Sequence, residues 1–123
     1  MPVTGLNHVN IRTTDVKKSA QFYVDIFDFE YRQGAEIMGQ RPNWLFDKQG
    51  HPIIHLRVLE SDSSSTGPID HVALSCVDKA ATLARLKTHN VEFQMAENIV
   101  PGVTQIFIKD PHGVPLELNF SGD

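Results

Sequence analysis

Apolar and polar residues alternate along several short stretches of the chain, which is the pattern of strands with one covered face. In residues 53–58, for example, Ile54, Leu56 and Val58 fall on one face, and His55 and Arg57 fall on the other. Eight such strands are predicted, at residues 6–12, 28–36, 43–47, 52–60, 70–77, 91–97, 103–110 and 114–120. Apolar residues recur at helical spacing in residues 13–27 and 78–89, so a helix is expected to follow the first and fifth strands.

The two halves of this pattern repeat with a constant offset. His8 and His71 are 63 positions apart, and so are the members of the pairs Asp15 and Asp78, Asp47 and Asp110, Gly50 and Gly113, and Pro52 and Pro115. The chain is therefore interpreted as two copies of one βαβββ unit. Module 1 spans residues 1–60, a Ser-rich linker spans 61–68, and module 2 spans 69–123.

Neither copy can bury both faces of its sheet alone, so the two are expected to share one fold. The predicted class is α+β. Within a single domain of residues 1–123, the two modules are expected to form a curved eight-stranded sheet with helices outside.

The polar faces of four strands carry the candidate chemistry. Strand alternation places His8, His71 and Glu117 opposite the apolar residues that should pack on the helices. Imidazole and carboxylate groups from separate strands suit a divalent ion of Fe, Mn, Zn, Ni or Co. His55 joins this set if strand parity decides its direction. Strict repeat alignment instead pairs Glu117 with Ile54, so His55 needs a one-residue shift after the turn, and both three and four ligands stay open.

Other residues on the same face are candidates for binding a substrate. Arg12 and Arg57 are available to hold a carboxylate, although for Arg12 a salt bridge at the rim is an equal alternative. The aromatic residues Trp44, Phe46 and Phe107 are expected on this face as a pocket lining, although such residues more often belong to a core.

Composition narrows the class of partner. Of 123 residues, 21% are charged and the formal net charge is −4, which argues against nucleic acid as a partner and favours a small molecule. No apolar run reaches membrane-spanning length, so no membrane partner is expected. The single cysteine and the absence of an apolar N-terminal signal region favour a cytoplasmic location.

The motifs "NHVNI", "DHVALS", "IIHLRV" and "IKDPHGVPLELNF" resemble the vicinal oxygen chelate superfamily, which includes glyoxalase I, extradiol dioxygenases and bleomycin-binding proteins. The resemblance implies metal ligands at His8, His55, His71 and Glu117, with Glu117 as the catalytic base and Arg12 as a substrate-binding residue. It also implies a homodimer.

In such enzymes a divalent ion binds two neighbouring substrate oxygens and stabilises an enediolate or enolate. Four protein ligands leave two positions for the substrate, so a lyase or isomerase is the first expectation. With three ligands there is also room for O₂, and an Fe(II)-dependent extradiol-type dioxygenase is the alternative. A metal-free small-molecule binding protein, like the bleomycin-binding relatives, is the third.

Overall fold

A computed structural model describes residues 5–60, 66–67 and 69–122 of the chain. The chain divides into two compact units, Met1–Asp62 and Ser63–Asp123. Their boundary falls at the predicted linker, of which residues 61–65 and 68 lie outside the described residues. Each unit is described by itself below.

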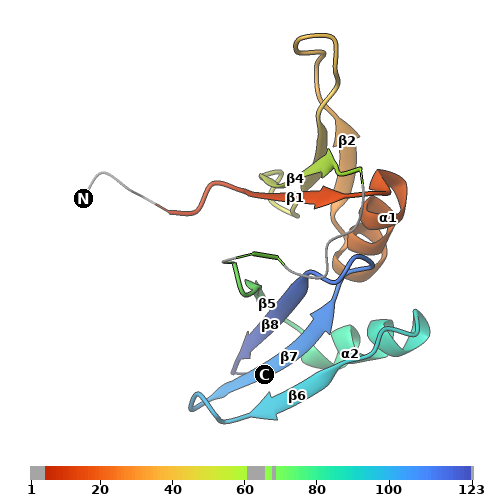
Figure 1. The fold of residues 1–123 in the computed structure, drawn as a ribbon. Helices are drawn as coiled ribbons and strands as arrows, with labels where there is room; N and C mark the ends of the chain where they lie inside the picture. Colours follow the sequence, from red (N-terminus) through yellow and green to blue (C-terminus); the bar gives the residue numbers. More distant parts are fainter. Residues whose placement is uncertain (1–4, 61–65, 68, 123) are drawn as a thin grey trace. The chain divides into compact units, whose positions relative to one another are not determined.

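The first unit has the predicted βαβββ order (Figure 1). Its elements are β1 (Val9–Thr13), α1 (Val16–Phe27), β2 (Glu30–Gln33), β3 (Asn43–Phe46) and β4 (Pro52–Val58). The sheet has the strand order β1-β4-β3-β2, with β1 parallel to β4 and antiparallel pairing elsewhere. The parallel pair brings the first and last strands of the unit side by side.

The second unit repeats this topology. Its elements are β5 (Val72–Cys76), α2 (Lys79–Thr88), β6 (Gln94–Glu97), β7 (Val103–Lys109) and β8 (Pro115–Ser121). The strand order is β5-β8-β7-β6, again with a parallel pair of first and last strands. The predicted α+β class and the twofold βαβββ repeat are confirmed, and the eight strands lie in two four-stranded sheets, one in each unit.

The repeated aspartates have structural roles that explain their spacing. Asp15 caps α1 by accepting a hydrogen bond from the Lys18 amide at 3.1 Å, and Asp78 caps α2 through the Ala81 amide at the same distance. These side chains satisfy amides in the first turn of each helix that have no partner within the helix.

The second pair of repeated aspartates builds the turn before the last strand of each unit. Asp110 Oδ1 accepts hydrogen bonds from the His112 and Val114 amides at 2.9 and 3.0 Å. Asp47 makes the equivalent bonds to the Gln49 and His51 amides in the first unit, at 3.0 and 2.9 Å. The constant offset between these two turns is therefore explained by backbone geometry and does not require a functional role.

A β-bulge distinguishes the two otherwise matching sheets. In the second unit β7 and β8 pair without interruption. In the first, Phe46 pairs with Pro52 and Leu45 with Ile54, so Ile53 is an extra residue in β4. Beyond the bulge, His55 pairs with Asn10 of β1, just as Glu117 pairs with Ala73 of β5. This is the one-residue shift that the sequence analysis required for His55.

Each unit has its own apolar core between helix and sheet. The most deeply buried apolar side chains are Tyr23, Leu45, Ile54 and Leu56 in the first unit, and Leu86, Ile106, Leu116, Leu118 and Phe120 in the second. Val58 differs from the sequence prediction: it is 72% exposed, although it shares strand parity with Ile54 and Leu56. It is the last residue of β4, where a strand face can extend beyond the layer that covers it. No helix in the described part of the chain is long and apolar enough to span a membrane.

Candidate functional site

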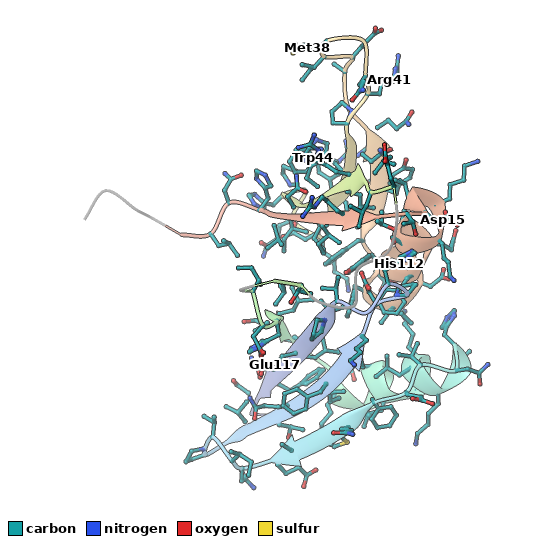
Figure 2. All side chains as sticks on the ribbon, viewed as in Figure 1. Asp15, Met38, Arg41, Trp44, His112 and Glu117 are labelled. Atoms are coloured by element: carbon teal, nitrogen blue, oxygen red, sulfur yellow. The ribbon has the colours of Figure 1, made fainter. Side chains whose placement is uncertain are left out.

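Two of the predicted ligands, His71 and Glu117, lie together in the second unit. His71 immediately precedes β5, and Glu117 lies in the middle of β8, the strand that pairs with β5. His71 Nε2 is 3.6 Å from Glu117 Oε1. The Glu117 side chain is only 16% exposed, so the carboxylate is largely screened from water, whereas His71 is 43% exposed. Figure 2 labels Glu117 on this sheet.

The residue before His71 fixes the direction of its ring. His71 Nδ1 donates a hydrogen bond to Asp70 Oδ2 at 2.8 Å, which leaves Nε2 facing Glu117. The hydrogen bond to Asp70 raises the pKa of His71, and the nearby Glu117 carboxylate acts in the same direction. A histidine whose Nδ1–H is held by a carboxylate, with Nε2 available, is the usual arrangement of a metal ligand.

Asn119 supports the carboxylate from the same strand. Its Nδ2 donates a hydrogen bond to Glu117 Oε2 at 2.9 Å, which leaves Oε1 on the His71 side. The Oδ1 atom of Asn119 is buried and has no hydrogen-bond partner among the described residues.

The other two predicted ligands, His8 and His55, lie near each other in the first unit. Their ring centroids are 6.4 Å apart. The indole of Trp44 stacks on His55, with centroids 4.5 Å apart and an interplanar angle of 17°, and it meets His8 at 4.9 Å and 76°. Trp44, which is labelled in Figure 2, therefore contacts both imidazoles and limits the directions that they can adopt.

His8 is oriented in the same way as His71. Its Nδ1 donates a hydrogen bond to Asn7 Oδ1 at 2.7 Å, which leaves Nε2 available. Asn7 and Asp70 occupy the same position of the repeat, one residue before each histidine. The sequence analysis missed both residues, although their shared offset of 63 was a signal that could have identified them.

His55 differs from the other histidines in its electrostatic surroundings. Desolvation lowers its pKa, and electrostatic repulsion from the neighbouring His8 and Arg57 lowers it further. The neutral imidazole is the form that binds a metal ion, so this environment favours the ligating state. Asn10 lies beside the ring, with 3.4 Å between its Nδ2 and His55 Nδ1.

The predicted substrate-binding residues of the first unit lie on the same face as His55. Arg12 and Arg57 are direct partners across β1 and β4, and Trp44 is the partner of His55 across β3 and β4. Phe46 lies on this face too, covered by the guanidinium of Arg32 at 3.8 Å from its ring centroid.

Phe107 occupies the position in the second unit that matches Trp44 in the first. It pairs with Glu117 across β7 and β8 and is 38% exposed. The expectation that these aromatic side chains lie on the polar face is therefore consistent with the strand pairing in both units.

The donor chemistry fits a divalent cation. The four side chains occur as two pairs, His8 with His55 and His71 with Glu117, and they offer imidazole nitrogen and carboxylate oxygen. No group of three or more metal-binding side chains was found among the described residues. The structure thus shows two donor pairs, one in each unit, and the complete ligand set stays a prediction.

Known proteins with similar sequences and folds place these features in a family. The family described as "Glyoxalase/Bleomycin resistance protein/Dioxygenase superfamily" matches residues 5–118. The "Uncharacterized protein YaeR" of Escherichia coli is 32% identical over 92% of this chain and 93% of its own length. "Glyoxylase I 4" of Arabidopsis thaliana is 26% identical over 94% of this chain and 70% of its own length.

A solved structure of similar fold contains a metal ion. The E126Q mutant of the fosfomycin resistance protein FosX from Listeria monocytogenes, complexed with Mn(II) and 1S,2S-dihydroxypropylphosphonic acid, has a TM-score of 0.72. It is 18% identical, and the match covers 98% of this chain and 90% of that chain. At this identity the similarity concerns the fold, which agrees with the family match along the sequence. The chain therefore belongs to the glyoxalase, bleomycin resistance protein and dioxygenase superfamily.

Proposed function

We propose that the protein is a divalent-metal enzyme that acts on a small substrate with two neighbouring oxygen atoms. The donors in this proposal are His8 and His55 from the first unit and His71 and Glu117 from the second. The observation that supports it most is that His8 and His71 are oriented in the same way. The Nδ1 atom of each ring donates a hydrogen bond to the preceding residue, Asn7 or Asp70, and Nε2 is left available.

The positions of His55 and Glu117 support the same proposal. The bulge in β4 gives His55 the pairing position that Glu117 has in β8. A bulge that re-aims a side chain is a common feature near functional sites. Without it, Ile54 would occupy that position and the first unit would offer one donor instead of two.

The proposed chemistry is a proton transfer next to a carbonyl group. A bound divalent ion would supply Lewis-acid polarisation of the substrate oxygens. Glu117, when its carboxylate is transiently released from the ion, would remove a proton from the neighbouring carbon and return it to a second position, which needs no redox cofactor. Asn119 would keep Glu117 Oε2 fixed while Oε1 does this, because the two oxygens have different partners.

A lyase or isomerase is the reaction class that this arrangement supports best. Four donors leave two of six octahedral positions for a bidentate substrate. The relative "Glyoxylase I 4" is consistent with this class. The homodimer and the cytoplasmic location stay predictions.

Metal content tests the donor set. Protein purified without chelator, or reloaded with Mn, Fe, Co, Ni or Zn, is expected to hold a divalent ion, measured by mass spectrometry. His71→Ala and Glu117→Ala should lower the affinity, because each removes one member of the second donor pair. His89→Ala is the matched control, since His89 is an exposed histidine at the end of α2. Wild-type affinity in both test variants would contradict the proposal.

Turnover tests the reaction class. Hemithioacetals of α-ketoaldehydes, acyl-CoA epimers and catechols would be offered to each metal form with and without oxygen. Product formation without oxygen, abolished by Glu117→Gln, is the expected result. Turnover only in the Fe(II) form, with oxygen consumed, would replace the proposed reaction with ring-cleaving dioxygenation.

A further inference from the structure

An open cavity of about 650 Å³ in the first unit is lined in part by His55. Its lining includes Arg57 and His55 from β4 and Asn43 from β3, together with Ile37, Gln40 and Arg41 from the hairpin that joins β2 to β3. A cavity of this size is suited to a small molecule. Two of its lining side chains are arginines.

The hairpin that carries Arg41 has a defined structure. Ile37 and Gln40 exchange backbone hydrogen bonds of 2.7 and 3.0 Å around a turn formed by Met38 and Gly39, both with positive φ. Figure 2 shows Met38 and Arg41 at this end of the hairpin.

The base of the hairpin, at Gly34 and Pro42, is also held by a backbone hydrogen bond. The Gly34 amide bonds to the Pro42 carbonyl at 2.8 Å, and a Cβ atom at Gly34 would come within 3.0 Å of the Pro42 side chain. Arg41, the residue before Pro42, is therefore attached to a fixed backbone beside the cavity.

The two cavity arginines lack carboxylate partners among the described residues, unlike Arg32 on the same sheet. Arg32 Nε lies 3.1 Å from Glu30 Oε1, and its guanidinium covers Phe46. Arg41 and Arg57 have no such ion pair in the described part of the chain. Both side chains are exposed, so they are open to a bound anion.

Arg12 adds to this positive charge. It is the direct partner of Arg57 across the parallel strands β1 and β4. Both side chains are exposed, and their pairing places two positive charges on the same face of the sheet. The chain as a whole carries a formal net charge of −4, so the cluster opposes the general charge of the protein.

The described residues of the second unit have no pair of arginines at the matching positions of β5 and β8. Ser75 and Asn119 are partners across β5 and β8, at the positions that Arg12 and Arg57 occupy in the first unit. Because the repeat preserves strand pairing but not these charges, the arginines are not a requirement of the fold. They point to a role in which the two halves of the chain differ.

We propose that Arg41 and Arg57 bind an oxyanion group of the substrate, a carboxylate or a phosphate-like group, in the cavity beside His55. A guanidinium can form two parallel hydrogen bonds with either group. The substrate of the proposed function would then be an anionic, oxygen-rich small molecule. This assignment of the substrate class rests on the proposed function. The anion site itself needs no metal, so it can be tested separately.

The test uses the chelator-treated protein and the fluorescence of Trp44, its one tryptophan, which stacks on His55 beside the cavity. Malonate and inorganic phosphate are the two anionic probes, and malonamide is the uncharged probe. Saturable binding of at least one anion, weakened by added salt, is expected, with no response to malonamide. The anion that binds identifies the group, whereas binding of neither would overturn the proposal.

Variants locate the site. Arg57→Gln and Arg41→Gln should each weaken anion binding about tenfold or more, because each removes a charged hydrogen-bond donor. Arg57→Lys should retain part of the affinity, since lysine keeps the positive charge but cannot form the two parallel hydrogen bonds of a guanidinium. Arg32→Gln is the matched control, with the same change of charge on a side chain that does not line the cavity. Equal loss of binding in the control would overturn the proposal.

Failure of this inference can be told apart from failure of the proposed function. Arg41→Gln is expected to bind the divalent ion as wild type does, because Arg41 is neither a proposed donor nor one of the groups that shift the pKa of His55. If the metal is bound normally but no variant changes anion binding, the anion site is wrong and the metal proposal stands.

Discussion

Replacing Asn119 with alanine is expected to weaken binding of the divalent ion about 10- to 100-fold. The change deletes the Nδ2 donor that lies 2.9 Å from Glu117 Oε2 and leaves the fold of β8 unchanged. Glu117 would then be free to rotate away from His71. Residues that hold a metal ligand in place typically affect affinity on this scale.

The structure gives the same magnitude by a second route. A hydrogen bond to a charged group contributes about 1.5–3 kcal/mol, and Glu117 is only 16% exposed, so water replaces the lost donor poorly. Since about 1.4 kcal/mol corresponds to a factor of ten in affinity, this amounts to roughly one to two orders of magnitude.

The assay is competition with a chelator of known affinity, read by absorbance, for wild type and variants loaded with the same ion. Gln105→Ala is the matched control: Gln105 pairs with Asn119 across β7 and β8, so it removes a neighbouring amide that does not hold Glu117. Wild-type affinity in Asn119→Ala, or an equal loss in Gln105→Ala, would refute the reasoning.

Three further changes have defined outcomes. Asp70→Asn should lower the pKa of His71 in the metal-free protein, because the hydrogen bond to Asp70 is the main cause of its raised value, and NMR titration of the His71 ring measures this. Because the pKa is raised in the folded state, the contact stabilises the fold below the ordinary histidine pKa, and this stabilisation is lost as the pH rises through the raised value. An unaltered His71 titration in Asp70→Asn would contradict the prediction. Gly34→Ala should destabilise the fold by roughly 1–3 kcal/mol in urea unfolding, because a Cβ atom would meet the Pro42 side chain at 3.0 Å. An unchanged unfolding midpoint would contradict this prediction, because it would mean that the base of the hairpin adjusts to the added atom. Leu118→Ala should cost about 2–5 kcal/mol in the same experiment, since this side chain is fully buried, and a loss below 1 kcal/mol would be inconsistent with that burial.

The repeat and the faces of its strands followed from the sequence alone. Alternation along a strand, capping by Asp15 and Asp78, and the turns at Asp47 and Asp110 depend on residues close together in the chain. Such local preferences can be recognised in the sequence without knowledge of the long-range contacts. For that reason an offset of 63 was enough to predict two βαβββ units.

Only some of the residues that hold the proposed ligands in place could have been predicted from the sequence. Asn7 and Asp70 could have been recognised from their repeat position, because each directly precedes its histidine. Asn119 could not, because nothing in a strand pattern shows that an amide turns back toward the residue two positions earlier. That contact depends on how the side chains fill the space above the sheet.

Pairing between strands decided the position of His55 and the anion cavity. The sequence left two registers open for His55, and the extra residue at Ile53 is accommodated only because β3 pairs with Pro52 and Ile54 on either side of it. Arg41 and Arg57 lie 16 positions apart in the sequence, and the antiparallel pairing of β3 with β4 is what brings them to one cavity. A register is a property of two strands together, so the pattern of either strand alone cannot determine it.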